Sequence, residues 1–218
     1  MCVNYLVPAF EDFRLHFDVD PPTWEYRREV FPGYAAPMLV LKPEHGEAMR
    51  VERAKFGLIP FWSKDDKIGR RTYNARSETV ATKPSYRGPW RRRQFCIVPV
   101  QAFFEPNYES GKAIRWKIAR GDGKPFGLAA IWDTWRPAEG QTEQSFSLLT
   151  VNAADHPLMR RFHAPDDEKR SVVVLGTANY STWLTADDEE DARELLSLFD
   201  ASAFEAEPSP APARSRSE

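Results

Sequence analysis

Short apolar runs separated by turn residues dominate the hydrophobic pattern of this chain. The runs lie at residues 38–41, 51–59, 95–105, 114–119, 126–132, 146–151 and 171–175, with turn signals such as Gly121-Asp122-Gly123 between them. Runs of this length, bounded by turn residues, are typical of β-strands. Many short strands and few helices predict an α+β fold built round an antiparallel, barrel-like β-sheet with flanking short helices.

Helical patterns are fewer. Residues 75–82 are expected to form a short helix that stops near Pro84, and another is expected to begin at Pro157, because proline suits a first helical turn. Residues 188–199 form an amphipathic pattern with an acidic first turn, and residues 87–93 are expected to be a basic loop. From about Ala201 onward the chain consists mainly of small residues, prolines and charged residues. We therefore expect one domain over residues 1–200 and a disordered tail over residues 201–218.

The composition narrows the class of protein. The 218 residues are 42% hydrophobic, which fits one domain with a sizeable core. No apolar run is long enough to span a membrane and no secretory signal is present, so we expect a cytoplasmic protein. Two cysteines, Cys2 and Cys96, do not indicate a disulfide framework. The histidines and cysteines lack paired ligand spacing, so neither a metal site nor another cofactor is predicted.

The charge is distributed unevenly along the chain. Residues 50–125 hold 18 Lys and Arg against 7 Asp and Glu, a local charge of +11, and since the whole chain carries −2 the remainder carries −13. A basic middle is compatible with an anionic polymer bound on one face. An uneven but merely solvated surface explains the charge equally well.

Cys2 is the first candidate for chemistry. Methionine before a small residue is commonly removed, which would leave Cys2 with a free α-amine and a thiol that titrate at roughly 8 and roughly 8.5. Such an aminothiol reacts with an aldehyde through an imine, which the thiol closes to a thiazolidine ring. It can also act as an acyl-transfer nucleophile with its own amine as base. The alternative is that a small residue at position 2 is incidental.

Two further segments carry polar groups in suggestive places. Asn74 can cap a helix, with Glu78 as the second residue of the cap. Alternatively, Asn74 can orient a ligand beside Arg76, which would bind phosphate. Glu105 ends an apolar strand, where a carboxylate either meets water or transfers protons.

A histidine and the aromatic residues complete the candidates. His163 follows Arg160 and Arg161, which suits proton transfer near a phosphate, although a lone histidine is more often structural. Trp62 precedes a polar loop close to the basic region, and aromatics interleaved with arginines suit a groove for single-stranded nucleic acid. Core packing is the ordinary alternative for any one aromatic.

Taken in order, these segments resemble the SOS response-associated peptidase (SRAP) family, the abasic-site shielding proteins. The resemblance covers residues 1 to about 200 and rests on Met-Cys at the start, Gly-Leu-Ile-Pro-Phe-Trp at 57–62, Asn-Ala-Arg-Ser-Glu-Thr at 74–79, Cys-Ile-Val-Pro at 96–99 leading to Glu105, Ala-Ala-Ile-Trp-Asp-Thr-Trp at 129–135, Leu-Thr-Val-Asn-Ala at 149–153 and His-Pro-Leu-Met-Arg-Arg-Phe-His at 156–163.

The resemblance implies a single SRAP domain that binds single-stranded DNA and crosslinks Cys2 to an abasic deoxyribose, with no cofactor. It further implies self-removal of Met1 and a possible β-elimination at the same site. We expect a monomer that associates with the nucleoid when bound to DNA. The implied roles are nucleophile for Cys2, positioning of the N-terminal residue and opened sugar for Asn74, proton transfer for Glu105 and His163, phosphate binding for Arg76 and Arg161, stacking for Trp62, and contact with the sugar-phosphate for Thr150.

The chain departs from the family pattern in three places. Val3-Asn4 stands where Gly-Arg is frequent, Pro106 stands where an aromatic is common, and residues 164–170 are longer than the compact family segment, so that Arg170 is a second candidate for the basic role given to Arg161. Two other functions remain open. One is an N-terminal-nucleophile amidohydrolase of the glutamine amidotransferase kind. Such domains usually begin with Met-Cys-Gly-Ile and carry further Asn-Gly and Asp motifs, and this chain does not contain that ordered series. The other is a non-covalent single-stranded DNA binding module.

Overall fold

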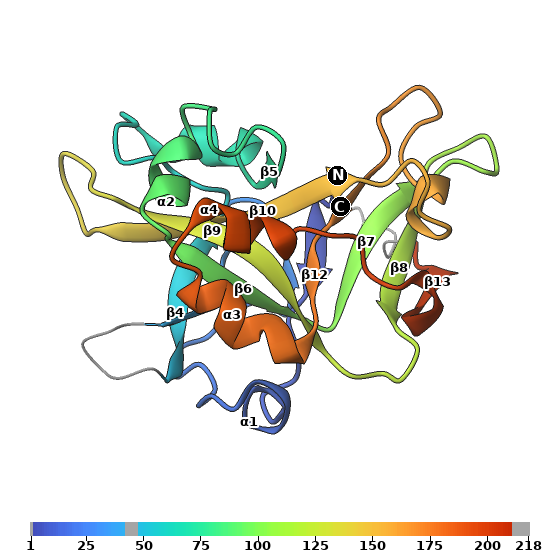
Figure 1. Ribbon diagram of the computed structural model, residues 1–218, viewed down its shortest axis with the longest axis horizontal. Helices are drawn as coiled ribbons and strands as arrows, with labels where there is room; N and C mark the ends of the chain where they lie inside the picture. Colours follow the sequence, from blue (N-terminus) through green and yellow to red (C-terminus); the bar gives the residue numbers. More distant parts are fainter. Residues whose placement is uncertain (1, 42–47, 211–218) are drawn as a thin grey trace, which may run out of the picture.

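A closed ring of strands forms the centre of the fold in the computed structural model, which describes residues 2–41 and 48–210 (Figure 1). The ring runs from β4 (Met49–Phe56) through β3 (Ala35–Leu41), β6 (Phe95–Val100) and β9 (Phe126–Trp135) to β10 (Glu143–Asn152), which pairs with β4 again. All of these pairings are antiparallel except that between β10 and β4. The prediction of an α+β fold round a barrel-like sheet is confirmed.

Shorter strands extend the ring and form a second sheet. β5 (Asn74–Arg76) and β11 (Arg170–Val172) pair with β10, while β12 (Val174–Leu175) pairs with β9. The second sheet has the order β13-β8-β7-β1-β2 and is antiparallel throughout. Its strands are β1 (Asn4–Leu6), β2 (Glu29–Val30), β7 (Ala102–Asn107), β8 (Ile114–Arg120) and β13 (Phe204–Pro208).

The helices are short and lie against the outside of the sheets. They are α1 (Asp12–Phe17), α2 (Arg87–Arg91), α3 (Tyr180–Thr185) and α4 (Glu189–Glu194), with 3-10 turns η2 (Asp66–Arg71), η3 (Met159–Arg161), η4 (Thr177–Asn179) and η5 (Ala201–Ala203). Within the described ranges, no helix has the length and apolar character needed to cross a bilayer.

The barrel core explains why the longest apolar run is continuous rather than alternating. Every residue of β6 is buried, because α3 covers the outer face of this strand. Trp183 of α3 stacks on Phe95 with 4.4 Å between ring centroids and donates its indole N–H to the carbonyl of Cys96 at 2.9 Å. A strand buried on both faces has no polar side to present.

Aromatic contacts join the second sheet to the barrel. Phe56 and Phe146 stack inside the barrel at 5.3 Å, and Tyr5 of β1 meets Phe56 edge-on at 5.4 Å. Edge and stacked ring pairs at these distances add to the energy of burial. They anchor β1, and so they hold Cys2 at the junction of the two sheets.

Three local predictions are wrong because tertiary contacts outweigh local propensity. Residues 75–82 do not form a helix: residues 74–76 are strand β5, which adds to the edge of β10, and turns follow. The basic segment at 87–93 contains α2, anchored by the fully buried Trp90. The helix expected over residues 188–199 is limited to α4, and beyond it Phe199 packs at 4.3 Å against Phe204.

The prediction of disorder from residue 201 is also wrong as far as the structure describes the chain. Residues 201–208 form η5 and β13, and β13 pairs with β8 over its whole length. Phe204 is the reason, since its ring is buried and lies 5.1 Å from that of Phe126. One aromatic residue in a Pro-rich, charged segment carries this order. The predicted tail from 211 to 218 lies outside the described residues.

Candidate active site

Cys2 is enclosed at the start of β1. Its side chain is 1% exposed, and its thiol donates to the carbonyl of Asn4 at 3.4 Å. The pairing of β1 with β7 sets Asn4 opposite Phe104, which brings the N-terminus beside Glu105. Burial, and then the negative charge of Glu105, raise the pKa of the Cys2 thiol far above its ordinary value. The thiol is therefore protonated at neutral pH.

Asn74 fixes the backbone of the cysteine. The side-chain N–H of Asn74 donates to the carbonyl of Cys2 at 2.8 Å. The backbone carbonyl of Asn74 accepts from the hydroxyl of Tyr86 at 3.0 Å. Burial raises the pKa of Tyr86 to about 12, so this hydroxyl stays a donor. The Asn74 Oδ1 atom is buried without a hydrogen-bond partner among the described residues. A buried acceptor in that state is suited to a ligand donor. The helix-capping alternative for Asn74 is excluded because the residue begins a strand.

Glu105 and His163 form a buried acid–base pair. The Oε2 atom of Glu105 lies 3.0 Å from the Nε2 atom of His163, and the two residues are 1% and 5% exposed. His163 has a φ of +68°, and its backbone N–H donates to the carbonyl of Pro106 at 2.8 Å. A non-glycine residue in the left-handed region is held there by its surroundings and is frequent at functional sites.

The structure thus brings together all four predicted catalytic residues. Cys2 precedes β1, Asn74 begins β5, Glu105 lies in β7 and His163 follows η3. One hydrogen bond, the 3.0 Å contact between Glu105 and His163 and the effect of Glu105 on the Cys2 thiol connect them. The result is a thiol, an amide, a carboxylate and an imidazole in one buried cluster, which we call the Cys2 cluster.

Both predicted phosphate-binding arginines lie at the surface. Arg76 is 49% exposed in its side chain and pairs with Glu168 at 2.7 Å. Arg161 binds Glu109 through Nε and Nη2 at 2.9 and 3.0 Å, with its guanidinium 5.0 Å from the ring of Trp116. Arg161 and Glu109 also line a cavity of about 600 Å³ that reaches His163.

Arg170, which was left as an alternative to Arg161, is an internal residue. It is 1% exposed and donates to the hydroxyl and the carbonyl of Thr150 at 3.2 and 2.7 Å, and to the carboxylate of Glu78 at 2.8 Å. No sequence pattern indicates this network, because Glu78, Thr150 and Arg170 are far apart in the chain. The hydroxyl of Thr150 also donates to the carbonyl of Ala75. Contact of Thr150 with DNA stays a prediction, and it would require this hydroxyl to exchange partners.

Trp62 lies in the loop after β4, and no described contact joins it to the Cys2 cluster. Its side chain is 48% exposed, and the neighbouring Phe61 is 62% exposed with the guanidinium of Arg92 at 5.9 Å. The loop depends on Gly57, which has a φ of +111° and would place a Cβ atom 2.2 Å from the carbonyl oxygen of Gly69. This close backbone approach holds two exposed aromatics next to the basic segment.

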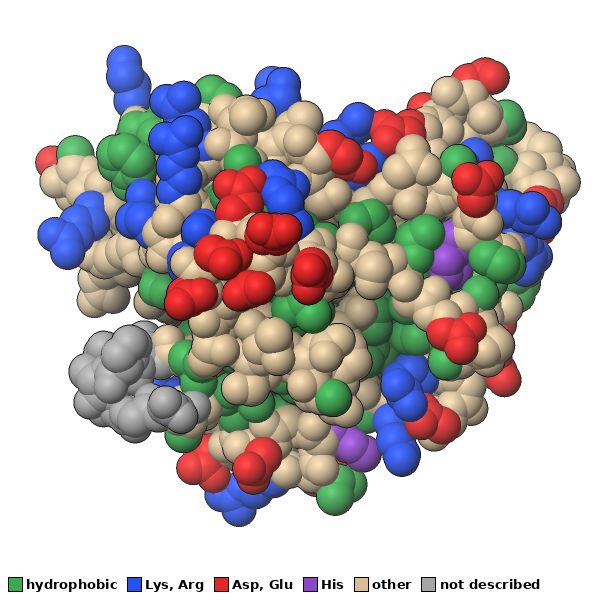
Figure 2. Space-filling model, in the orientation of Figure 1, with side chains coloured by type: hydrophobic (Ala, Val, Ile, Leu, Met, Phe, Trp, Pro, Cys, Tyr) green, Lys and Arg blue, Asp and Glu red, His purple; other side chains and the backbone are tan. Residues whose placement is uncertain are grey.

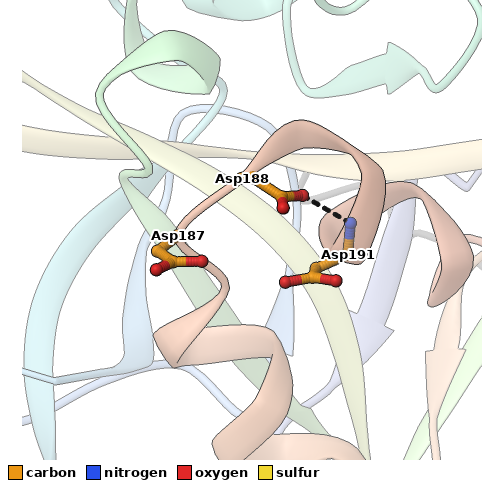
Figure 3. A group of neighbouring side chains, drawn as sticks. All are labelled: Asp187, Asp188 and Asp191. Carbon is orange, nitrogen blue, oxygen red and sulfur yellow. Dashed lines mark hydrogen bonds between the residues drawn. The ribbon is translucent and has the colours of Figure 1, made fainter.

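One group of acidic side chains has the proximity of metal ligands. Asp187, Asp188 and Asp191 have carboxylate oxygens within 4.8 Å of one another, and all three are exposed (Figure 3). The Asp188 carboxylate accepts from the backbone N–H of Asp191 at 2.8 Å and so caps α4. Helix capping accounts for the geometry of this group.

Comparison with known proteins identifies the family. A family model described as "SOS response associated peptidase (SRAP)" matches residues 1–211. The chain belongs to the SRAP family. Among its relatives is the abasic site processing protein YoqW of Bacillus subtilis, which is 29% identical over 212 residues covering 94% of this chain and 91% of YoqW. Another is the abasic site processing protein YedK of Escherichia coli, 30% identical over 83% of this chain and 74% of YedK.

Solved structures share the fold of this chain. A crystal structure of a protein from Bordetella bronchiseptica has a TM-score of 0.88 and 32% identity, covering 96% of this chain and all of that one. A protein from Bacteroides thetaiotaomicron at 23% identity shares the fold with a TM-score of 0.80. Asn4 is the first residue of β1. It is 6% exposed and donates to Glu29 at 2.6 Å, so it faces inward.

Proposed function

We propose that this protein processes abasic sites in DNA by forming a covalent crosslink between Cys2 and the opened sugar in a single strand. The observation that carries the proposal is the assembly of the Cys2 cluster from four separate segments. The relatives named abasic site processing proteins support the substrate. An opened abasic sugar presents an aldehyde, which undamaged DNA lacks, so reactivity itself distinguishes the substrate.

The protonated thiol favours an order of bond formation. Because burial keeps the thiol of Cys2 neutral, the α-amine freed by loss of Met1 adds first to the aldehyde carbon. The resulting carbinolamine takes up a proton on its hydroxyl and loses water to give an iminium ion. The sulfur then attacks the same carbon, its proton leaves to a base, and the C=N electron pair returns to nitrogen. A five-membered thiazolidine results, and atoms and charge balance with one water released.

Glu105 and His163 serve the proton transfers of this sequence. A negative charge that disfavours the thiolate of Cys2 favours a positive iminium at the same position. The carboxylate can then take the thiol proton and pass it to His163, whose Nε2 atom is 3.0 Å away. Asn74 holds the Cys2 carbonyl and offers Oδ1 to the amine or to a sugar hydroxyl.

The exposed aromatic rings and arginines of the surface suit a flexible single strand. Phe61 and Trp62 expose their rings for base stacking, and Arg76 and Arg161 are accessible to phosphates. An abasic nucleotide has little stacking to lose on leaving the strand. Self-removal of Met1, a β-elimination from the iminium and a monomeric state belong to the same proposal.

The test uses single-stranded DNA with one abasic site, analysed on a denaturing gel after incubation with the purified protein. A shifted covalent band is expected, and it should be absent with Cys2→Ala. A strand with tetrahydrofuran at the same position is the matched control, because it has no aldehyde. Intact mass of the protein should first show that Met1 is missing.

Other outcomes identify the alternatives. Reversible binding to both strands without a covalent band would contradict the crosslink and indicate a simple binding module. Release of ammonia from glutamine that depends on Cys2 would indicate an amidohydrolase. Retention of Met1 would exclude the amine of Cys2 as the nucleophile.

A further inference from the structure

The two arginines expected to bind phosphate near the Cys2 cluster already hold carboxylates. Arg161 is bound by Glu109 through two parallel contacts of 2.9 and 3.0 Å, and Arg76 is bound by Glu168 at 2.7 Å. Arg161 stands two residues before His163 and lines the same cavity. By contrast, the exposed Arg70 and Arg71 make no ion pair within residues 2–41 and 48–210.

Groups other than these arginines hold the backbone of Glu109 and the carboxylate of Glu168 in place. The backbone N–H of Glu109 donates to the side chain of Asn107 at 2.9 Å, which fixes the turn after β7. The carboxylate of Glu168 accepts from the buried Arg170 at 2.6 Å and from Asn152 at 3.3 Å. Glu168 belongs to the longer segment between His163 and β11, where this chain departs from the compact family pattern.

The geometry of the Arg161–Glu109 pair resembles that of a two-contact phosphate complex, whereas Arg76 and Glu168 make a single contact of 2.7 Å. A guanidinium presents a planar fork that matches two oxygens of a carboxylate or of a phosphate. Trp116 supports the guanidinium of Arg161 from one side at 5.0 Å, so the arginine is already ordered for a phosphate. The hydrogen bond from Arg161 lowers the pKa of Glu109 to about 2, and the carboxylate therefore stays charged at every pH used for binding measurements.

We propose that Glu109 and Glu168, the latch carboxylates, are specificity-determining residues that compete with DNA phosphates for Arg161 and Arg76. The inference rests on the proposed function and deepens it. A strand must displace both carboxylates before it can settle at the Cys2 cluster. An undamaged strand forms no covalent bond with Cys2 and dissociates. An abasic strand is captured covalently while it is bound. Discrimination thus depends on weak reversible binding as well as on the aldehyde.

Removal of a latch has a defined signature in salt dependence. Each phosphate that contacts a cation releases counterions and steepens the plot of log K against log salt by about 0.7 for a single strand. When a DNA phosphate displaces a latch carboxylate from its arginine, the carboxylate binds a cation from solution. This uptake cancels part of the counterion release from the DNA. Glu109→Gln and Glu168→Gln should each tighten binding to undamaged DNA about fivefold at low salt and steepen the slope by up to about 0.7.

The experiment titrates a labelled, undamaged single strand with the full-length wild-type protein, Glu109→Gln, Glu168→Gln and the double variant at several NaCl concentrations. Asp122→Asn is the matched control, because Asp122 pairs with Arg120 by the same two-contact geometry, at 2.8 and 2.6 Å, in the turn that follows the opposite end of β8. Equal far-UV circular dichroism and melting temperatures establish that each variant folds. The control should bind as the wild type does.

A double-mutant cycle separates competition from net charge. In an Arg161→Ala background, Glu109→Gln should no longer tighten binding, because the arginine it occupied is gone. Crosslinking of an abasic strand by the latch variants should also be inhibited more strongly by excess undamaged competitor than crosslinking by the wild type.

Unchanged or weaker binding of undamaged DNA by both latch variants would overturn the inference, as would an equal gain in Asp122→Asn. Such a result would leave the proposed function standing if the wild type still forms the Cys2-dependent band. If no band forms in any variant, the proposed function fails, and an arginine-dependent gain in reversible binding would still support the latch.

Discussion

At Cys2, folding and reactivity make opposite demands. Burial gives the N-terminus a fixed position beside Asn74 and Glu105, but it also raises the pKa of the thiol and suppresses the thiolate. A buried, protonated thiol is compatible with the reaction if the α-amine of Cys2 attacks the aldehyde first. The sulfur then closes the ring on the iminium carbon that this attack has produced. Burial then protects the thiol from other electrophiles until the substrate has bound.

Glu105→Gln tests this view of the residue. The substitution preserves volume and removes the charge, so crosslinking of an abasic strand should slow by about 100-fold, the usual range for loss of a proton-transfer group. Affinity for an undamaged strand should stay within about twofold, because Glu105 is 1% exposed. Rates from quenched time courses on denaturing gels check both.

The same variant should have a more reactive thiol. The charge of Glu105 helps to raise the pKa of Cys2, so its removal lowers that pKa and should speed alkylation by iodoacetamide at pH 8. Glu205→Gln, at an exposed glutamate in β13, is the matched control and should change neither rate. Crosslinking that continues at the wild-type rate in Glu105→Gln would remove this residue from the mechanism.

At the scale of elements, the strand periodicity was predictable and the pairing partners were not. The apolar run at 95–105 was expected as one strand, yet it divides at Gln101 into β6 of the barrel and β7 of the second sheet. This division carries Glu105 away from the barrel wall to the side of Cys2. The helix expected at 75–82 was a prediction from local propensity, and it failed because the edge of β10 offers backbone partners to residues 74–76.

The last strand provides a prediction at this scale. Phe204→Ala removes a buried ring that contacts Phe126 and Phe199 at 5.1 and 4.3 Å. The free energy of unfolding should fall by about 3 kcal/mol, measured by urea denaturation with circular dichroism. Glu205→Gln, at the next position of the same strand, should change it by less than about 0.5 kcal/mol. A loss equally small for Phe204→Ala would mean that β13 contributes little to the fold.

Across the whole molecule, charge is sorted by the fold into separate regions. Figure 2 shows basic side chains gathered over the end that carries α2 and acidic side chains over α4, whose first turn holds Glu189, Glu190 and Asp191. The net charge of −2 conceals this separation. Many carboxylates are also paired with arginine or lysine, which couples folding to pH.

Acid should therefore destabilise the protein. Hydrogen bonds from Arg170, Arg193 and Lys55 hold the pKa values of Glu168, Glu189 and Asp66 below those of the unfolded chain. Their stabilisation is complete above the unfolded values and is lost as the pH falls through the folded ones. Because these groups are exposed, each contribution is small. The melting temperature should be about 5 °C lower at pH 3 than at pH 5.

Differential scanning calorimetry at low salt measures this difference. In Glu168→Gln, which lacks one of the titrating groups, the fall between pH 5 and pH 3 should be smaller than in the wild type. A melting temperature that is equal or higher at pH 3 would contradict the proposed coupling.

The sequence by itself determined where most of the longer strands lie, which family the ordered motifs indicate and which residue types are available for chemistry, because periodicity and ordered motifs are local properties. It did not determine that Arg170 is internal, that Asn74 bonds the Cys2 carbonyl, or that Glu109 and Glu168 occupy the surface arginines. Those contacts join residues that lie from 20 to 92 positions apart in the chain. Only the closure of the barrel and the docking of β7 and β1 decide such distances, since they depend on where whole strands come to lie.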